Sequence, residues 1–535
     1  MITPPASMQS GSIWDAMSSE PLLETTVGTV LRRAAALAPY RIALVAGTPD
    51  PGARRRWTYT ELLDDAIRCA HWLLTLVEPG ERVAIWAANE PEWVIAMYGA
   101  AFAGVVIVPM NPAFRTGEAA QVLGPSGASL VIHADKHRSN PIAAHVVEMR
   151  KRIPSLRASV RISDVFDSIA SYPTVGALPD GSPDDLAQIQ FTSGTTGFPK
   201  GARLHHRGIT NNARLMHRRL GMLEGDVYLN PNPMFHLGGC GLGTLGPPQF
   251  LATHVLVHQF EAGLFLDLLE DEKATITGAV PTMLIALLEQ PGFDGRDLSK
   301  LRTVSSGGSV VPADLVRRIE KRLGVKYSTM FGQTEASPGI TQTHLDDSPE
   351  DKGATVGQPL DHMAVKIVDT AGNVVGAGEP GELLARSPVI MQSYWNLPVE
   401  TAAAVDADGW LHTGDLCTMD ERGYCSVIGR LKDMITRGSE NIYPREIEDL
   451  LFGDASVAEV AVVGVPDTRL GEAVAAFIRP EPGAVVDVDA LRELVGSMLA
   501  RHKVPVHWAV VDAMPTTASG KIQKHALVEL WERTR

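Results

Sequence analysis

Short apolar runs that alternate with helical segments constrain the fold of this chain more than any other feature. Residues 83–86 and 105–108 are rich in Val and Ile and predict buried strands. Between them, Asn89 followed by Glu92 has the spacing of a helix capping box, and Gly104 suits the end of that helix. Strands that alternate with helices predict an α/β fold with mixed or parallel sheets flanked by helices.

The last hundred residues predict a separate, small α+β unit. With 535 residues, the chain is too long for one compact core. We expect a large N-terminal domain over residues 1–431 and a small mobile domain over 432–535, with a hinge near Lys432. The predicted elements of the small domain are helices at 445–452 and 489–499 and strands at 460–463, 474–478 and 506–511.

The charge balance and the cysteines exclude several functions. Lys and Arg number 48 against 62 Asp and Glu, a net charge of −14, which argues against nucleic acid or an anionic membrane as a partner. There is no apolar run of the roughly 20 residues that a membrane span needs, and no signal-peptide pattern. The four Cys form no metal-ligand spacing. We expect a cytoplasmic protein that is a monomer or a homodimer.

A loop rich in Gly, Ser and Thr at residues 191–201, F-T-S-G-T-T-G-F-P-K-G, follows a predicted strand at 187–190. Such residues let backbone N–H groups and hydroxyls approach phosphate oxygens, and Lys200 adds a positive charge. It is not the common nucleotide P-loop, because Pro199 interrupts that pattern. Composition alone fits a phosphate loop and a flexible surface turn equally well.

The same loop resembles the S-G-T-T-G-x-P-K-G signature of the adenylate-forming enzymes, which include acyl-CoA synthetases, luciferases and adenylation domains of peptide synthetases. Further matches extend the resemblance from about Thr58 to Lys524. The resemblance implies ATP binding, with Thr196 also acting in catalysis and at the metal. The loop residues that it assigns to ATP are Thr192, Ser193, Gly194, Thr195, Thr196, Gly197 and Lys200.

Residues 331–335, F-G-Q-T-E, resemble the family's aromatic-G-x-T-E motif, with Phe331 in place of the usual Tyr. The resemblance implies that this ring stacks on adenine, that Thr334 contacts the α-phosphate and that Glu335 holds Mg²⁺ and acts in catalysis. A hard cation on carboxylate and phosphate oxygens would neutralise the departing pyrophosphate. Gly332 and Gln333 complete the nucleotide contacts, and Gly332 also borders the acid.

Two further segments match the nucleotide site of the family. In S-G-G-S, residues 306–309, the resemblance places Gly307, Gly308 and Ser309 beside the nucleotide and Gly308 also beside the acid. In W-L-H-T-G-D, residues 410–415, Asp415 would accept hydrogen bonds from the ribose, and Arg430 would contact ribose or phosphate. Taken singly, these segments fit ordinary turns and a surface arginine.

Near the C-terminus, residues 515–522, P-T-T-A-S-G-K-I, resemble the family loop whose lysine is required for adenylation. Lys521 would bridge the attacking carboxylate and the α-phosphate, which lowers the repulsion between two anions. Any single Lys is by default a surface residue. The complete motif favours the catalytic interpretation.

The G-x-G-x-x-G match at residues 241–246 does not predict a dinucleotide site, because no clean strand precedes it and two prolines follow at once. It continues P-M-F-H-L-G-G-C, residues 233–240, which resembles the segment that opens the acyl pocket. His236 would gate the pocket beside the reacting carboxylate, and Gly239 and Cys240 would line it. The Gly and Cys run is expected to leave space for an acyl chain or a ring. The lack of an Asp beside His236 argues against an α-amino acid.

The acceptor loop is R-G-S-E-N-I-Y-P, residues 437–444, which resembles the R-G-G-E-N-I-Y-P loop of CoA ligases. The resemblance assigns Gly438, Ser439 and Glu440 to coenzyme A. Ser439 replaces a Gly and would narrow the tunnel for the pantetheine. A carrier-protein phosphopantetheine, on an acyl carrier protein, and an amine therefore stay open as alternative acceptors.

These matches predict an ATP-dependent carboxylic acid:CoA ligase that forms acyl-AMP and pyrophosphate and then acyl-CoA and AMP. ATP, Mg²⁺ and coenzyme A would be required. Segments near Ser193, Asn232 and Gly438 most resemble medium-chain fatty acyl-CoA synthetases. The alternative is an adenylating ligase that passes an aryl or acyl group to a carrier-protein thiol or an amine. A luciferase-type oxygenase has no specific support, and intact Lys521 and Glu335 argue against a catalytically silent binding protein.

Overall fold

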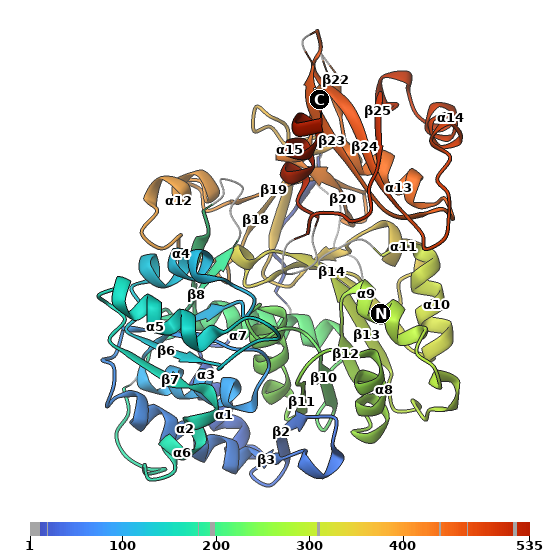
Figure 1. Ribbon diagram of the computed structural model, residues 1–535. Helices are drawn as coiled ribbons and strands as arrows, with labels where there is room; N and C mark the ends of the chain where they lie inside the picture. The colour runs from blue at the N-terminus through green and yellow to red at the C-terminus, as the bar shows by residue number, and fades with distance from the viewer. Residues whose placement is uncertain are drawn as a thin grey trace.

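The computed structural model describes residues 11–18, 20–179, 181–192, 198–307, 311–437, 440–467, 469–516 and 522–534 (Figure 1). The strands of these residues form four sheets, and helices cover the two largest. The α/β fold predicted from the alternating strands and helices is confirmed.

The first large sheet has six strands, parallel except for its last member. In spatial order they are β7 (Ala158–Arg161), β6 (Leu130–His133), β4 (Arg82–Trp86), β5 (Val106–Met110), β8 (Leu186–Thr192) and β9 (Lys200–His205). The predicted strands near residues 83 and 105 are β4 and β5. The antiparallel β8–β9 pair carries the Gly-rich loop at its turn.

The second large sheet has nine strands, of which the run from β14 to β2 is parallel. In spatial order they are β16 (Gln358–Pro359), β15 (Gly339–Gln342), β14 (Lys326–Gly332), β13 (Thr303–Gly307), β12 (Ile276–Gly278), β10 (Val227–Asn230), β11 (Thr253–Val257), β2 (Ile42–Gly47) and β3 (Arg56–Thr58). Parallel strands end at one sheet edge, so Gly307 and Gly332 lie at the edge where ligands bind in such folds.

The described part of the chain has twelve α-helices before residue 440, and most of them lie around these sheets. They are α1 (Val27–Leu37), α2 (Tyr59–Leu73), α3 (Pro91–Ala103), α4 (Thr116–Ser126), α5 (Ile142–Arg152), α6 (Val165–Ile169), α7 (His206–Arg219), α8 (Ala262–Asp271), α9 (Pro281–Leu288), α10 (Ala313–Leu323), α11 (Pro349–Ala354) and α12 (Pro398–Ala404). Helix α3 contacts both β5 and β2, so it packs between the two sheets. Beyond Glu92 in its first turn, its side chains are predominantly apolar on every face, as burial on every side requires.

The predicted cap of α3 is wrong, although the end of the helix at Gly104 is confirmed. The N-cap is Glu90, and it makes no side-chain capping bond. Asn89 is buried instead, and its amide donates to the carbonyl oxygens of Asn232 and Val257. A buried Asn satisfies its amide where carbonyl groups are at hand, so a long-range tie replaced the local cap.

The remaining sheets are smaller. An antiparallel sheet joins β1 (Ile13–Trp14), β17 (Ala364–Val368), β18 (Gly381–Arg386), β19 (Leu411–Met419) and β20 (Cys425–Arg430). The last sheet contains β22 (Glu440–Ile442), β21 (Ile435–Arg437), β24 (Gly471–Pro480), β23 (Val457–Asp467) and β25 (His507–Val510). Helices α13 (Pro444–Phe452) and α14 (Val488–Met498) share one apolar cluster with it, and α15 (Lys524–Thr534) shares another. This confirms the α+β character predicted for the C-terminal region.

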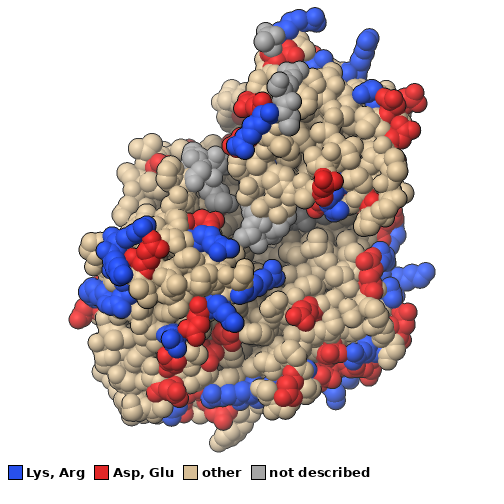
Figure 2. Space-filling model, viewed as in Figure 1, with Lys and Arg blue, Asp and Glu red and all other residues tan. Residues whose placement is uncertain are grey.

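All four cysteines, Cys69, Cys240, Cys417 and Cys425, are free and buried. Burial raises the pKa of each thiol far above its ordinary value. Within the described part of the chain, no helix combines the length and the apolarity needed to cross a bilayer. On the face seen in Figure 2, acidic and basic side chains are interspersed.

Candidate active site

The hairpin of β8 and β9 brings the two described ends of the Gly-rich loop together. Thr192 and Lys200 are register partners, and the Thr192 hydroxyl donates to the Lys200 carbonyl oxygen at 3.4 Å. The loop connects two neighbouring antiparallel strands, and a Gly-rich turn of this kind can present backbone N–H groups to phosphates. The predicted loop residues between these ends, Ser193, Gly194, Thr195, Thr196 and Gly197, lie outside the described residues.

The F-G-Q-T-E segment forms the end of β14 and a short turn of 3₁₀ helix, Thr334–Ala336. Phe331 is half-buried at the sheet edge. At Gly332 an added Cβ would lie 2.9 Å from the Cα of Gly339 and closer still to the carbonyl oxygen of Pro338. Only glycine therefore fits that position. The tight packing fixes where Thr334 and the following carboxylate leave the sheet.

Glu335 is 9% exposed, and its carboxylate is held by a residue that the sequence did not single out. The Tyr394 hydroxyl donates to Glu335 Oε1 at 2.7 Å. Lys200 Nζ lies 5.3 Å from the centre of the Tyr394 ring, within the range of a cation–π contact. Lys200 of the Gly-rich loop and Glu335, the carboxylate predicted to bind a metal, thus both contact Tyr394.

Asp415 and Arg430 form an ion pair across β19 and β20, with Arg430 Nε 3.0 Å from Asp415 Oδ1. Asp415 is 4% exposed, whereas about half of the Arg430 side chain is exposed. Gly414, in the left-handed region at φ 68°, turns the strand just before the aspartate. The two residues predicted to face the ribose are therefore brought together.

The predicted acyl segment, residues 233–240, runs into a six-residue π-helix, Gly238–Gly243. His236 is exposed, and its ring lies 4.5 Å from that of Phe235. The expectation that the glycines leave space is wrong at Gly239, where an added Cβ would lie 2.5 Å from the carbonyl carbon of Pro233. At Gly243 the amide of Asn230 fills the space in the same way. These glycines allow close packing of the segment rather than an opening.

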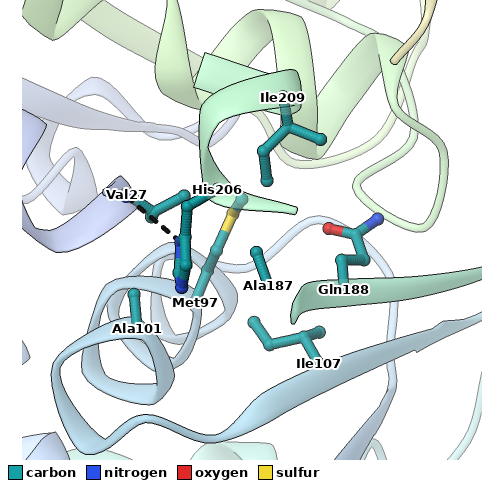
Figure 3. Close-up of a pocket in the computed structure, with 8 residues that line it drawn as sticks. All are labelled: Val27, Met97, Ala101, Ile107, Ala187, Gln188, His206 and Ile209. Carbon is teal, nitrogen blue, oxygen red and sulfur yellow. Dashed lines mark hydrogen bonds between the residues drawn. The ribbon is translucent and has the colours of Figure 1, made fainter. Parts of the chain in front are cut away.

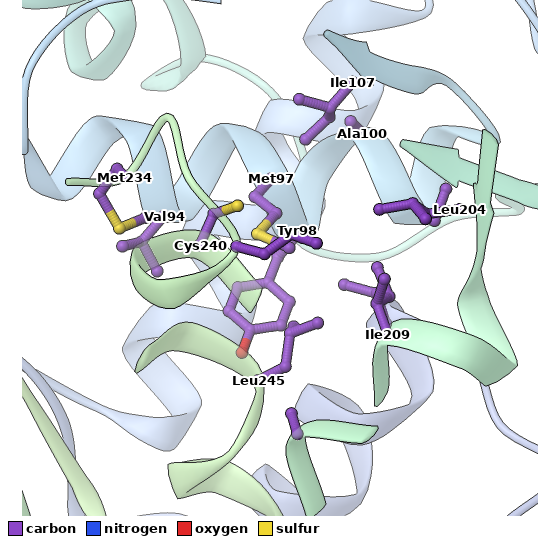
Figure 4. Packing of buried hydrophobic residues seen from close by; sticks show 14 of the residues in the cluster. Val94, Met97, Tyr98, Ala100, Ile107, Leu204, Ile209, Met234, Cys240 and Leu245 are labelled. Carbon is purple, nitrogen blue, oxygen red and sulfur yellow. The ribbon is translucent and has the colours of Figure 1, made fainter. Parts of the chain in front are cut away.

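Buried glutamine side chains of β8 form hydrogen bonds that support the acyl segment. Gln190 donates to the Phe235 carbonyl oxygen at 3.0 Å, and Gln188 donates to Gln190 Oε1 at 2.7 Å. The Gln188 amide nitrogen also lies 3.6 Å from Cys240 Sγ. Figure 4 shows Cys240 among the packed side chains, including Met97. Both glutamines are nearly inaccessible, and burial raises the pKa of Cys240 to about 12, so its thiol stays neutral.

A cavity of about 10 Å³ is lined by Gln188 together with side chains of α3 and α7 (Figure 3). Met97 and His206 border it, and the His206 ring accepts a hydrogen bond from the backbone of Val27. Burial lowers the pKa of His206 to about 4, so the ring is neutral at pH 7. The cavity holds at most about one water, so it is no ready-made acyl site.

The other predicted residues divide between described and undescribed segments. Gly307 ends β13, Gln333 is the N-cap of the 3₁₀ turn, and Glu440 is exposed at the start of β22. Lys432 is exposed in a 3₁₀ turn, Leu431–Asp433, between β20 and β21. Gly308, Ser309, Gly438, Ser439 and Lys521 lie outside the described residues.

Sequence reasoning missed Tyr394, Gln188, Gln190 and Asn89 as parts of the site. The two glutamines lie on alternate positions of β8, so both face one side of a strand that otherwise reads as apolar. Two polar residues at alternate positions of an otherwise apolar strand were the signal that could have indicated this buried polar site. Tyr394 lies 59 residues beyond its carboxylate partner, and nothing in the local pattern marks it.

The chain resembles known proteins over most of its length. The family model for AMP-binding enzymes matches residues 31–395, and that for the C-terminal domain of AMP-binding enzymes matches residues 446–521. The medium-chain acyl-CoA ligase ACSF2 of Mus musculus is 34% identical, over 96% of this chain and 88% of its own. Feruloyl-CoA synthase of Amycolatopsis sp is 37% identical, over 87% and 92%. The structure of a Mycobacterium tuberculosis fatty acyl CoA synthetase is 30% identical, with a TM-score of 0.78 over 95% of this chain and 99% of that one.

Proposed function

We propose that this chain, which belongs to the AMP-binding, adenylate-forming enzymes and is an AMP-forming acid–CoA ligase, activates a medium-chain fatty acid. The observation that carries the site assignment is the meeting of Lys200 and Glu335 on Tyr394. It puts a cation and a carboxylate at one place, next to the Gly-rich loop. That is the pair of groups that a nucleoside triphosphate with its metal requires.

In the first half-reaction, the acid carboxylate attacks the α-phosphorus of ATP in line, and the bond to pyrophosphate breaks. Lys200 and the loop from Thr192 bind the phosphates, Asp415 and Arg430 bind the ribose, and Phe331 lies against the adenine. Lys521 offsets the repulsion between the acid and the α-phosphate. Positioning and charge neutralisation supply most of the rate in such transfers.

Glu335 is the residue that fits Mg²⁺, together with Thr196 of the loop. Among the described residues there is no group of three or more His, Cys, Asp and Glu that could hold a metal by itself. This suits Mg²⁺, which commonly binds through one or two carboxylates and the substrate phosphates. When bound, the ion would neutralise charge on the departing pyrophosphate.

In the second half-reaction, the thiolate of coenzyme A attacks the acyl carbon, and AMP leaves with the oxygen. We propose that residues 432–535 turn about Lys432 between the two steps, which withdraws Lys521 and brings in Gly438, Ser439 and Glu440. The exposed position of Lys432 between two sheets supports a hinge. Lys521→Ala should stop adenylation but spare thioester formation from supplied acyl-AMP. Equal loss of both steps would contradict the two-state account.

The acid is tested by mass spectrometry of the products from ATP, Mg²⁺, coenzyme A and a library of acids. We expect the highest rates of pyrophosphate release with saturated acids of medium length, as for a relative of the medium-chain acyl-CoA ligase ACSF2. Reaction with aromatic acids alone would refute this and would favour the feruloyl-CoA synthase relative as the guide. A parallel reaction with an acyl carrier protein in place of coenzyme A tests the alternative acceptor.

A further inference from the structure

We infer that Tyr394 is a positioning residue for the metal-binding carboxylate: its hydroxyl holds one oxygen of Glu335 so that the other can face the cation. This inference rests on the role proposed for Glu335. The hydrogen bond of 2.7 Å is the distance expected for a phenol that donates to a carboxylate. Because a carboxylate has two oxygens, a bond to Oε1 leaves Oε2 to bind an ion.

The backbone around Tyr394 is fixed independently of its side chain. The N–H of Trp395 donates to the Gly201 carbonyl oxygen at 2.7 Å, and the Arg203 N–H donates to the Ser393 carbonyl oxygen at 2.9 Å. The segment from Met391 to Trp395 therefore runs along β9. At its other end, the Met391 N–H donates to the backbone carbonyl oxygen of Glu335 at 2.7 Å. Residues 391–395 therefore bind the backbone of β9 and also bind Glu335 twice, once at its backbone carbonyl oxygen and once at its carboxylate.

The phenol can act only as a donor in this pair. An ionised carboxylate has only acceptor oxygens, so the hydrogen of this bond comes from the phenol. A protonated hydroxyl fixes the rotamer of the carboxylate before any cation arrives. Residues that orient metal ligands in this way usually change metal affinity by about 10- to 100-fold when they are lost.

The ring and the hydroxyl can be separated by substitution. Tyr394→Phe removes only the hydrogen bond and keeps the ring under Lys200. Tyr424→Phe is the matched control, because the Tyr424 hydroxyl donates to Asp347 Oδ1 at 2.6 Å in a pair of the same chemistry. Each variant loses one phenol–carboxylate bond, but only Tyr394 contacts Glu335.

The experiment measures Mn²⁺ binding to the full chain by electron paramagnetic resonance, with a non-hydrolysable ATP analogue present. Tyr394→Phe should raise the Mn²⁺ dissociation constant about tenfold, while Tyr424→Phe leaves it unchanged. The Mg²⁺ concentration that half-saturates ATP–pyrophosphate exchange should rise in parallel. In a Glu335→Gln background, Tyr394→Phe should have no further effect.

Two outcomes overturn the inference in distinguishable ways. If Glu335→Gln weakens Mn²⁺ binding but Tyr394→Phe changes it less than twofold, the tyrosine does not position the carboxylate, and the proposed metal site stands. If Glu335→Gln itself binds Mn²⁺ as the native chain does, the metal role proposed for Glu335 fails first. A melting temperature for each variant shows that the chains compared are folded.

Discussion

Gly239→Ala provides a sharp test of the acyl segment, because the added methyl group meets backbone rather than a movable side chain. Its Cβ would lie 2.5 Å from the carbonyl carbon of Pro233, 2.9 Å from the carbonyl oxygen of Asn232 and closer still to that of Pro233. Carbon atoms in contact are normally about 3.5–4 Å apart, so the overlap is about 1 Å. Either the π-helix or the segment before it has to move by about that distance.

We expect two separable effects of this movement. The chain should lose about 1–3 kcal/mol of unfolding free energy, the usual range for an overpacked core. A displacement of about 1 Å near reacting atoms can lower the rate about 100-fold. The kcat/KM for the acid should therefore fall by about that factor in a pyrophosphate-release assay, with ATP affinity in calorimetry unchanged.

Gly238→Ala is the matched control, since the nearest atom to its added Cβ is the Cβ of Asn232 at 3.8 Å. This variant adds the same methyl group one residue earlier without an overlap. It should keep kcat/KM for the acid within about threefold of the native value, because ordinary van der Waals contacts need no rearrangement. The argument fails if Gly239→Ala behaves like Gly238→Ala, or if ATP affinity falls in step with acid turnover.

Three further predictions concern other parts of the site. Asp415→Asn should weaken ATP binding about 10- to 100-fold in calorimetry, because an amide cannot replace the charged acceptor that Arg430 and the ribose share. An unchanged ATP affinity would show that Asp415 does not bind the ribose. Gln190→Leu should lower the unfolding free energy in urea by about 1–3 kcal/mol, because the Phe235 carbonyl oxygen loses its donor; an equally stable variant would contradict the polar support. Burial raises the pKa of Glu92 from 4.5 to about 7, so the folded state disfavours its charged form and native stability should fall as pH rises through this window. Glu92→Gln should remove this fall and gain about 2 kcal/mol relative to the native chain between pH 5 and pH 7.5, and parallel pH profiles would refute it.

The elements that depend on local patterning were predicted well from the sequence. The apolar runs of β4 and β5, the end of α3 at Gly104 and the α+β character of the last region all follow from periodicity and from glycine. The nucleotide-site residues came from resemblance in continuous motifs. Of these, Asp415 and Arg430 are paired in the structure and Glu335 is buried at the site.

The features that failed or were missed depend on contacts between distant segments. Asn89 has the spacing of a helix cap, but its side chain donates instead to the carbonyl oxygens of Asn232 and of Val257 at the end of β11. Tyr394 and Glu335 are joined only when the segment beyond β18 returns along β9. The glycines near residue 239 predict open space, but a sequence does not show which backbone fills the place of a missing side chain.

The burial of all four cysteines makes the native chain a convenient starting point for site-specific labelling. Buried thiols with raised pKa values react slowly with maleimides, since the thiolate is the reactive form. Cysteines introduced at exposed Val147 on α5 and exposed Val485 in the C-terminal region would then carry a fluorophore pair without removal of the native cysteines. Energy transfer between the two dyes would follow, in single molecules, the rotation proposed to separate the two half-reactions.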